Sequence, residues 1–246
     1  MNNQSVTAKF SAIAHSYEQA AFIEQEIGQR LISNLQELNL TPKYILDLGC
    51  GTGLFTTQIM TLFPQAQIIG LDLSLEMVKI ATQKHNLNAV CANGVQMPFA
   101  NLQFDLVIAN CCIPIMPLLS EIQRILKIDG LFVCSSMGPD TFHELSIVND
   151  NWLDMHILGD ILLQQNFKDP IVNAEKINFN YPNIELLLED LQESGHDIEH
   201  TSITSHDSCA VTVEAIYVMA WKTVTSQFRD DAGNIFVNID TIQHLS

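Results

Sequence analysis

Three glycines alternate with other residues in the segment Asp47-Leu48-Gly49-Cys50-Gly51-Thr52-Gly53. The segment follows a short apolar run and precedes a stretch of helical character, which predicts a turn between a strand and a helix. Glycines in such a turn let the backbone approach a ligand closely, and the Asp47 carboxylate can bind a ligand ammonium. A turn that holds a dinucleotide pyrophosphate has the spacing Gly-x-Gly-x-x-Gly instead. The pattern favours the zwitterionic end of an amino acid as ligand, although the glycines alone also fit a tight turn that binds nothing.

A second acidic residue, Asp72, ends the next apolar run, 19 residues after Gly53. A carboxylate at this position can accept hydrogen bonds from both hydroxyls of a ribose. Taken alone, Asp72 could instead cap the helix that follows it. The glycine turn and the acid together predict a site for a ligand that has both an amino-acid end and a ribose.

Apolar runs and helical patterns alternate along the chain, which predicts a parallel α/β sheet that positions these residues. We expect helices over residues 8–39, 54–62, 74–85, 118–126, 153–165 and 184–194. We expect strands over residues 44–48, 68–72, 89–91, 104–109, 131–135, 176–181 and 211–221. No linker or internal repeat divides the chain, so we expect residues 1–246 to form one domain, with a C-terminal tail over 223–246.

Composition excludes several classes of partner. The formal net charge is −17, and the 11 Lys and Arg residues are scattered rather than clustered. Binding to nucleic acid or to an anionic membrane surface needs a concentrated cationic patch, so we expect neither. The sequence has no long apolar run for a membrane span and no apolar segment of a signal peptide near its start, so we expect a cytoplasmic protein.

The motifs between Ile45 and Ser135 resemble, in order and spacing, those of class I S-adenosylmethionine-dependent methyltransferases. The resemblance implies a Rossmann-like, doubly wound α/β fold with a mostly parallel seven-stranded sheet and an antiparallel last strand. It also implies S-adenosylmethionine as cofactor. Asn93 stands where the class usually has an Asp that accepts a hydrogen bond from the adenine amino group, and its carbonyl can still accept one. The implied cofactor-binding residues are Asp47, Gly49, Cys50, Gly51, Gly53, Asp72, Leu73, Met77, Asn93, Gly94, Val95, Asn110 and Cys111.

A narrower resemblance extends over most of the remaining chain, to the malonyl-acyl-carrier-protein O-methyltransferases of biotin synthesis. It implies an acceptor that is a small acid or an acyl group on a carrier protein. The Pro-Asp-Thr and Asp-Met-His segments are its most specific part. The matching segments are Phe10 with Ala14 and Tyr17, Gly138-Pro139-Asp140-Thr141, Glu144-Leu145, Asp154-Met155-His156, Gly159-Asp160, Val211-Thr212-Val213-Glu214 and Ala220-Trp221-Lys222.

The departures from this family fall where the acceptor should bind. Ser146 stands where an Arg is common, and the connection that follows it is short. The scattered cations also offer no basic patch for an acidic carrier protein. Two alternatives therefore stay open, a diverged small-molecule methyltransferase and a non-catalytic S-adenosylmethionine-binding assembly factor. An open cavity beside Asn110 would favour an enzyme, and a cavity plugged by Met116 or the tail would favour the binding factor.

Two residues are candidates for catalysis. Tyr17 shares a helix face with Phe10 and Ala14, and we expect residues 1–40 to form an N-terminal helical lid over the cofactor, although that face could simply pack on the sheet. His156 follows Asp154 in a family segment and could line the acceptor pocket, although a lone His near a helix start is more often structural. His196, His200, His206, Asp207 and Cys209 are possible metal ligands, but we do not expect a metal site, because that stretch is polar and loop-like.

Overall fold

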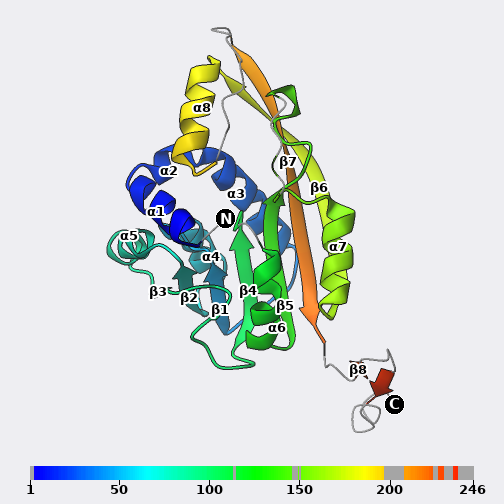
Figure 1. Ribbon diagram of the computed structural model, residues 1–246. Coiled ribbons are helices and arrows are strands. Elements are labelled where there is room, and N and C mark those ends of the chain that lie inside the picture. Colours follow the sequence, from blue (N-terminus) through cyan, green and yellow to red (C-terminus); the bar gives the residue numbers. More distant parts are fainter. Residues whose placement is uncertain are drawn as a thin grey trace.

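A central sheet of seven strands organises the protein in the computed structural model, which describes residues 3–112, 115–145, 149, 151–196, 208–223, 227–229 and 235–237 (Figure 1). The strands are β1 (Tyr44–Leu48), β2 (Gln67–Asp72), β3 (Ala89–Cys91), β4 (Phe104–Asn110), β5 (Leu126–Met137), β6 (Phe167–Tyr181) and β7 (Cys209–Lys222). Their order in the sheet is β3-β2-β1-β4-β5-β7-β6. Strands β1 to β5 pair in parallel, and β7 runs antiparallel to both of its neighbours. The predicted fold class is therefore confirmed.

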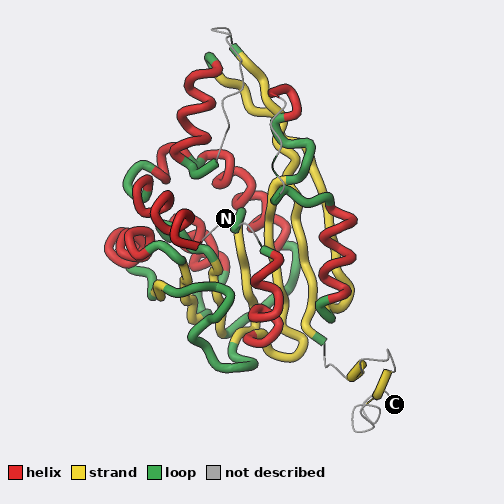
Figure 2. The backbone as a smooth tube through the Cα atoms, in the orientation of Figure 1, coloured by secondary structure: helices red, strands yellow, loops and turns green. Residues whose placement is uncertain are grey.

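Helices cover both faces of this sheet (Figure 2). Alternate residues of one strand point to opposite faces, so Leu106 and Ile108 of β4 belong to one apolar cluster and Val107 and Ala109 to another. The first cluster includes residues of α3, α4, α5 and α8, and the second includes residues of α6 and α7. The helices are α1 (Asn3–Ile13), α2 (Tyr17–Ala20), α3 (Phe22–Gln36), α4 (Leu54–Leu62), α5 (Leu75–His85), α6 (Leu119–Ile125), α7 (Met155–Gln164) and α8 (Ile184–Glu193), with 3₁₀ helices η1 (Met116–Leu118) and η2 (His143–Leu145).

The single long helix expected over residues 8–39 is wrong, because the structure has three helices there, α1, α2 and α3. The first break follows Ile13, whose carbonyl accepts hydrogen bonds from the backbone N–H and the hydroxyl of Ser16. The second break is at Ala21, whose ψ of 39° is not helical. The breaks let α1 turn toward α5, where the hydroxyls of Ser11 and Ser74 lie 2.9 Å apart.

Strands β6 and β7 extend beyond the end of β5, which pairs with β7 only as far as Met137 opposite Ala215 (Figure 1). Residues 176–181 and 209–214 therefore pair only with each other, and together with α8 they form what we call the arm. The arm reaches the N-terminal helices, because the ring of Phe22 lies 5.7 Å from the ring of Phe179 and 5.5 Å from that of Tyr181. Residues distant in sequence thus meet at one edge of the molecule.

Much of the expected tail lies outside the described residues, apart from the antiparallel pair β8 (Gln227–Arg229) and β9 (Ile235–Val237). In the part of the chain that the structure describes, no helix is long and apolar enough to cross a membrane. That the whole chain is one domain stays a prediction.

Candidate active site

The glycine turn is built as its sequence predicts. Gly49, Gly51 and Gly53 all have positive φ angles, of 75°, 53° and 85°, which side chains rarely adopt. The backbone N–H groups of Gly49 and Cys50 donate to the carbonyl of Leu71, which fixes the turn against β2. A Cβ on Gly49 would lie 2.7 Å from the sulfur of Cys112, so a larger residue would clash there. The turn thus presents bare backbone at the carboxyl end of β1.

Asp72 organises this turn from the end of β2. Its Oδ2 accepts a hydrogen bond of 2.9 Å from the N–H of Gly51, and its Oδ1 accepts one of 2.8 Å from the N–H of Ser74. Burial raises the pKa of the carboxyl. The side chain lines a large cavity, and each of its oxygens has a second lone pair for a ligand donor. Asp72 does not itself cap α5, because the N-cap is Ser74, whose hydroxyl accepts the N–H of Met77.

Asp47 lies deeper than Asp72 and is 1% exposed. Its Oδ2 accepts a hydrogen bond of 2.5 Å from the hydroxyl of Thr56. Burial raises the pKa of Asp47 to about 7, even though the bond from Thr56 opposes that shift. Asp47 lines only a small cavity of about 50 Å³ below the glycine turn.

A cavity of about 330 Å³ brings most of the predicted site residues together. This volume lies within the range of small-molecule sites. Asp47 and Cys50 line only the smaller cavity, whereas Gly53 and His156 line neither. The predicted residues that line the large cavity are Tyr17, Gly49, Gly51, Asp72, Leu73, Met77, Asn93, Gly94, Val95, Asn110 and Cys111.

Asn110 connects three elements beneath the cavity. Its Nδ2 donates to the backbone carbonyl of Glu24 at 2.9 Å, and its Oδ1 accepts from the hydroxyl of Ser135 at 2.6 Å. The same hydroxyl accepts the N–H of Cys111 at 3.1 Å, which holds that residue at a positive φ of 50°. The end of β4 is therefore fixed to both β5 and α3.

The ring of Tyr17 lies next to the glycine turn, on the side of Gly51. A Cβ on Gly51 would lie 3.9 Å from Cε1 of Tyr17, and the ring makes an edge contact with Phe10 at 6.4 Å. Burial raises the pKa of the phenol well above its ordinary value, and the nearby charge of Glu24 raises it further. The phenol is therefore neutral and lines both cavities.

His156 lies apart from these residues. It is exposed in the first turn of α7, where its backbone N–H donates to Oδ1 of the capping residue Asp154 at 2.8 Å. The structure thus assigns Asp154 to starting the helix and does not bring His156 to either cavity.

Sequence reasoning missed several residues of the cavity wall, among them the charged or titratable residues Lys9, Glu24 and His196. Oε1 of Glu24 lies 2.7 Å from Nε2 of His196, although the two residues are 172 positions apart. The inward position of Glu24 beside the apolar residues Ile27 and Leu31 of α3 was a signal that could have found it. The other missed residues include Met137, Asn149, Asn151 and Ser194.

Of the five possible metal ligands in the sequence, the structure describes only His196 and Cys209. Within the described residues no group of three or more His, Cys, Asp or Glu is arranged to hold a metal ion. His200, His206 and Asp207 lie outside those residues, as does Ser146, the departure from the family's Arg.

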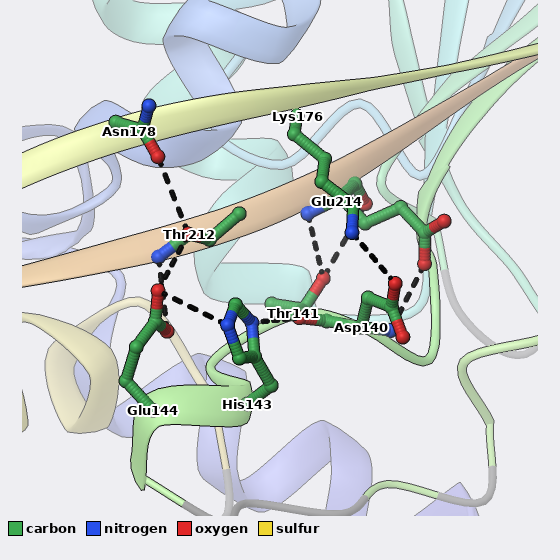
Figure 3. Close-up of polar contacts among 8 residues, drawn as sticks. All are labelled: Asp140, Thr141, His143, Glu144, Lys176, Asn178, Thr212 and Glu214. Atoms are coloured by element: carbon green, nitrogen blue, oxygen red, sulfur yellow. Dashed lines mark hydrogen bonds and ion pairs between the residues drawn. The ribbon is translucent and has the colours of Figure 1, made fainter.

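The Pro-Asp-Thr and Glu-Leu segments fasten the loop after β5 to the arm (Figure 3). The hydroxyl of Thr141 accepts the N–H of Glu214 at 3.1 Å. The carboxylate of Glu144 accepts both the hydroxyl of Thr212 at 2.5 Å and its N–H at 3.1 Å. The loop that follows Met137, a residue of the cavity wall, is thus fixed to the arm.

Comparison with known proteins agrees with this geometry. The family described as "Methyltransferase domain" matches residues 46–134. The structure of YcgJ from Bacillus subtilis matches 80% of this chain and 99% of its own, with a TM-score of 0.58 and 15% identity. Phosphoethanolamine N-methyltransferase 2 of Haemonchus contortus, solved with S-adenosyl-L-methionine, matches 80% of this chain and 53% of its own, with a TM-score of 0.55 and 19% identity. At these identities the structures establish the fold.

Malonyl-[acyl-carrier protein] O-methyltransferase of Legionella pneumophila is 33% identical over 89% of this chain and 91% of its own length. The enzyme of that name numbered 1 in Coxiella burnetii is 28% identical over 98% of this chain and 96% of its own length. The chain belongs to the malonyl-[acyl-carrier protein] O-methyltransferase family.

Proposed function

We propose that this protein methylates the free carboxylate of a malonyl group on an acyl carrier protein, a step of biotin synthesis. The observation that carries the proposal is the open cavity beside Asn110, which also reaches Met137 and Asn149. Met116 is 45% exposed and does not line the cavity, so it does not plug the acceptor end. The names of the relatives supply the identity of the acceptor.

What supports cofactor binding in the large cavity is that its wall carries polar groups that could pair with those of S-adenosylmethionine. Asp72 would accept from the ribose hydroxyls, because both of its oxygens retain a lone pair. Leu73 and Met77 would pack against the adenine. Oδ1 of Asn93 already accepts the N–H of Val95 at 3.1 Å, and its second lone pair would accept the adenine amino group. Tyr17 would cover the glycine turn as part of a lid formed by residues 1–40.

Bound S-adenosylmethionine supplies a methyl group activated by a sulfonium. The protein therefore has mainly to align the acceptor and exclude water. A carboxylate is ionised at neutral pH and needs no general base. Its oxygen forms the new bond to carbon as the carbon–sulfur bond breaks, and the electron pair of that bond stays on sulfur. Asn149 would offer a neutral amide donor to the acceptor in place of the family's Arg.

The direct test is incubation of the purified protein with S-adenosylmethionine and malonyl-acyl carrier protein, followed by mass spectrometry of the carrier. We expect the carrier to gain the mass of one methylene unit and to lose it on ester hydrolysis. Acetyl-acyl carrier protein, which lacks the free carboxylate, is the matched control and should not change. Cofactor binding without turnover of the malonyl carrier or of malonyl-coenzyme A would contradict the proposal. We further propose that the protein is one domain and acts in the cytoplasm.

A further inference from the structure

We propose that Glu24 is the counter-ion of the methionine ammonium of S-adenosylmethionine, and that His196 positions it. Nothing in the motifs of the class assigns either residue. The inference rests on cofactor binding and is independent of the acceptor's identity.

Glu24 lies where the two cavities meet. It occupies the first turn of α3, and its backbone carbonyl is held by Nδ2 of Asn110 at 2.9 Å. Its side chain lines the small cavity under the glycine turn and also the large cavity. Gly49 and Gly51 line both cavities as well, so the carboxylate and the turn share one space. The amino-acid end of a ligand on that turn would lie in the same space.

The Glu24 carboxylate has one oxygen that needs a donor. The residue is only 6% exposed, and Oε1 is paired with Nε2 of His196 at 2.7 Å. Within the described residues, Oε2 has no hydrogen-bond partner and is shielded from solvent. A buried carboxylate oxygen without a donor is destabilising, and a cation with N–H donors removes that penalty. An ammonium group has this chemistry.

Asp47, the acid that the motif suggests for this role, is less suited to it. It is nearly inaccessible, it is hydrogen-bonded to Thr56, and it lines only the small cavity. Its pKa of about 7 also leaves it partly protonated near neutral pH. Glu24, by contrast, lines both cavities, and within the described residues its Oε2 has no hydrogen-bond partner.

The charge of Glu24 also acts on the groups around the reacting centre. It raises the pKa of Tyr17 and of Cys111, second only to burial in both cases. Both residues line the large cavity. A negative charge at this place stabilises a cationic ligand and repels an acceptor carboxylate, which favours the cofactor as the group that Glu24 meets.

His196 keeps the carboxylate in place from the far side of the cavity. Its ring makes an edge contact with Trp152 at 6.3 Å. The preceding residue, Gly195, lies against Phe10 of α1, since a Cβ there would be 2.7 Å from that ring. The turn after α8 therefore brings His196 to Glu24 and packs on the N-terminal helices at the same time.

The test is calorimetry of wild type and Glu24→Gln with two ligands, S-adenosylhomocysteine and 5′-methylthioadenosine. The first ligand has the ammonium, and the second lacks the whole amino-acid end. We expect the substitution to weaken the affinity for S-adenosylhomocysteine about 30-fold and to leave the affinity for 5′-methylthioadenosine unchanged. Glu26→Gln is the matched control, because Glu26 is on the same helix but is only half-buried and is paired with Arg30. His196→Gln should weaken S-adenosylhomocysteine less than Glu24→Gln does.

Three results would overturn the inference. Unchanged S-adenosylhomocysteine affinity in Glu24→Gln, with a changed KM for the acceptor, would assign Glu24 to the acceptor. Equal loss for both ligands would mean that Glu24 does not act through the amino-acid end of the ligand. If Glu24→Gln does not fold, wild type can be titrated with S-adenosylhomocysteine that lacks only its amino group, and equal affinity for the two compounds would refute the proposal.

Discussion

The buried acid at the end of β1 makes a prediction about stability that can be worked from its pKa. Asp47 has a pKa of about 7 in the folded protein, compared with an ordinary value of 3.8. As pH rises from 5 to 8, the unfolded chain is already ionised, whereas the folded protein must lose its Asp47 proton. A raised pKa therefore lowers the free energy of unfolding over this window, by about 3 kcal/mol from linkage.

Asp47→Asn removes this titration and keeps the shape of the side chain, and its Oδ1 can still accept the hydroxyl of Thr56. At pH 5 Asp47 is mostly neutral in the folded wild type but already ionised in its unfolded chain, so linkage should make the variant more stable than wild type by about 2 kcal/mol there. At pH 8 the variant should be more stable than wild type by about 3 kcal/mol more than at pH 5. Urea unfolding at the two pH values, followed by the fluorescence of the buried Trp152, measures this difference.

Asp105→Asn is the control for this experiment. Burial alone would raise the pKa of Asp105, but hydrogen bonds, first from Lys127, lower it overall. Asp105 therefore finishes titrating below pH 5, and its substitution should change stability equally at pH 5 and pH 8. If Asp47→Asn also shifts stability equally at both values, within about 1 kcal/mol, the buried-acid reasoning is refuted.

Three further predictions concern the cavity and the arm. Asp72→Ala should weaken the affinity for S-adenosylhomocysteine, measured by calorimetry, roughly 100-fold, because two hydrogen bonds to ribose are lost. Gly49→Ala should lower the free energy of unfolding by about 2 kcal/mol in urea, because a Cβ would meet Cys112 at a positive φ. Thr212→Val should lower the free energy of unfolding by about 2 kcal/mol in the same assay and leave cofactor affinity unchanged, since it removes only the hydroxyl's contacts to Glu144 and Asn178.

Each of these three predictions has its own contrary result. Wild-type affinity in Asp72→Ala would remove that residue from the ribose site. An unchanged urea midpoint in Gly49→Ala would mean that the turn relaxes away from Cys112. A loss of cofactor affinity in Thr212→Val would mean that the contacts of Figure 3 reach the cavity and are more than structural.

The elements with strong local signals were predicted to the residue. The bounds of β1, α4 and β3 agree with the apolar runs and helical pattern of the sequence, because each element ends at a glycine, proline or polar turn nearby. Strand β6 was predicted only from residue 176 and begins at Phe167. Its first half contains Asp169 and Pro170 and is half exposed at the edge of the sheet. Pairing with β7 supplies its hydrogen bonds, and no local pattern reports that pairing.

The residues of the candidate site also fall into two groups, those that the sequence predicted and those that it did not. The glycine turn and Asp72 were found because they lie on consecutive strands of one βαβ unit, where spacing in sequence determines spacing in the fold. Glu24 and His196 come from opposite ends of the chain and meet only after the arm has packed on the N-terminal helices. The break at Ala21, which orients α3, contains neither glycine nor proline and follows from tertiary packing. Such contacts have no signature in a single sequence.

The contact between the N-terminal helices and the arm joins segments that leave the ribosome at very different times. The glycine turn and Asp72 emerge early, but the wall formed by His196 is synthesised 172 residues after its partner Glu24. Contacts of such long sequence separation form late in folding, because the chain between them must first be ordered. A nascent chain that stops before α8 can complete its first five strands and still lack one side of its binding site. The cavity wall is therefore complete only after residue 196 has been synthesised.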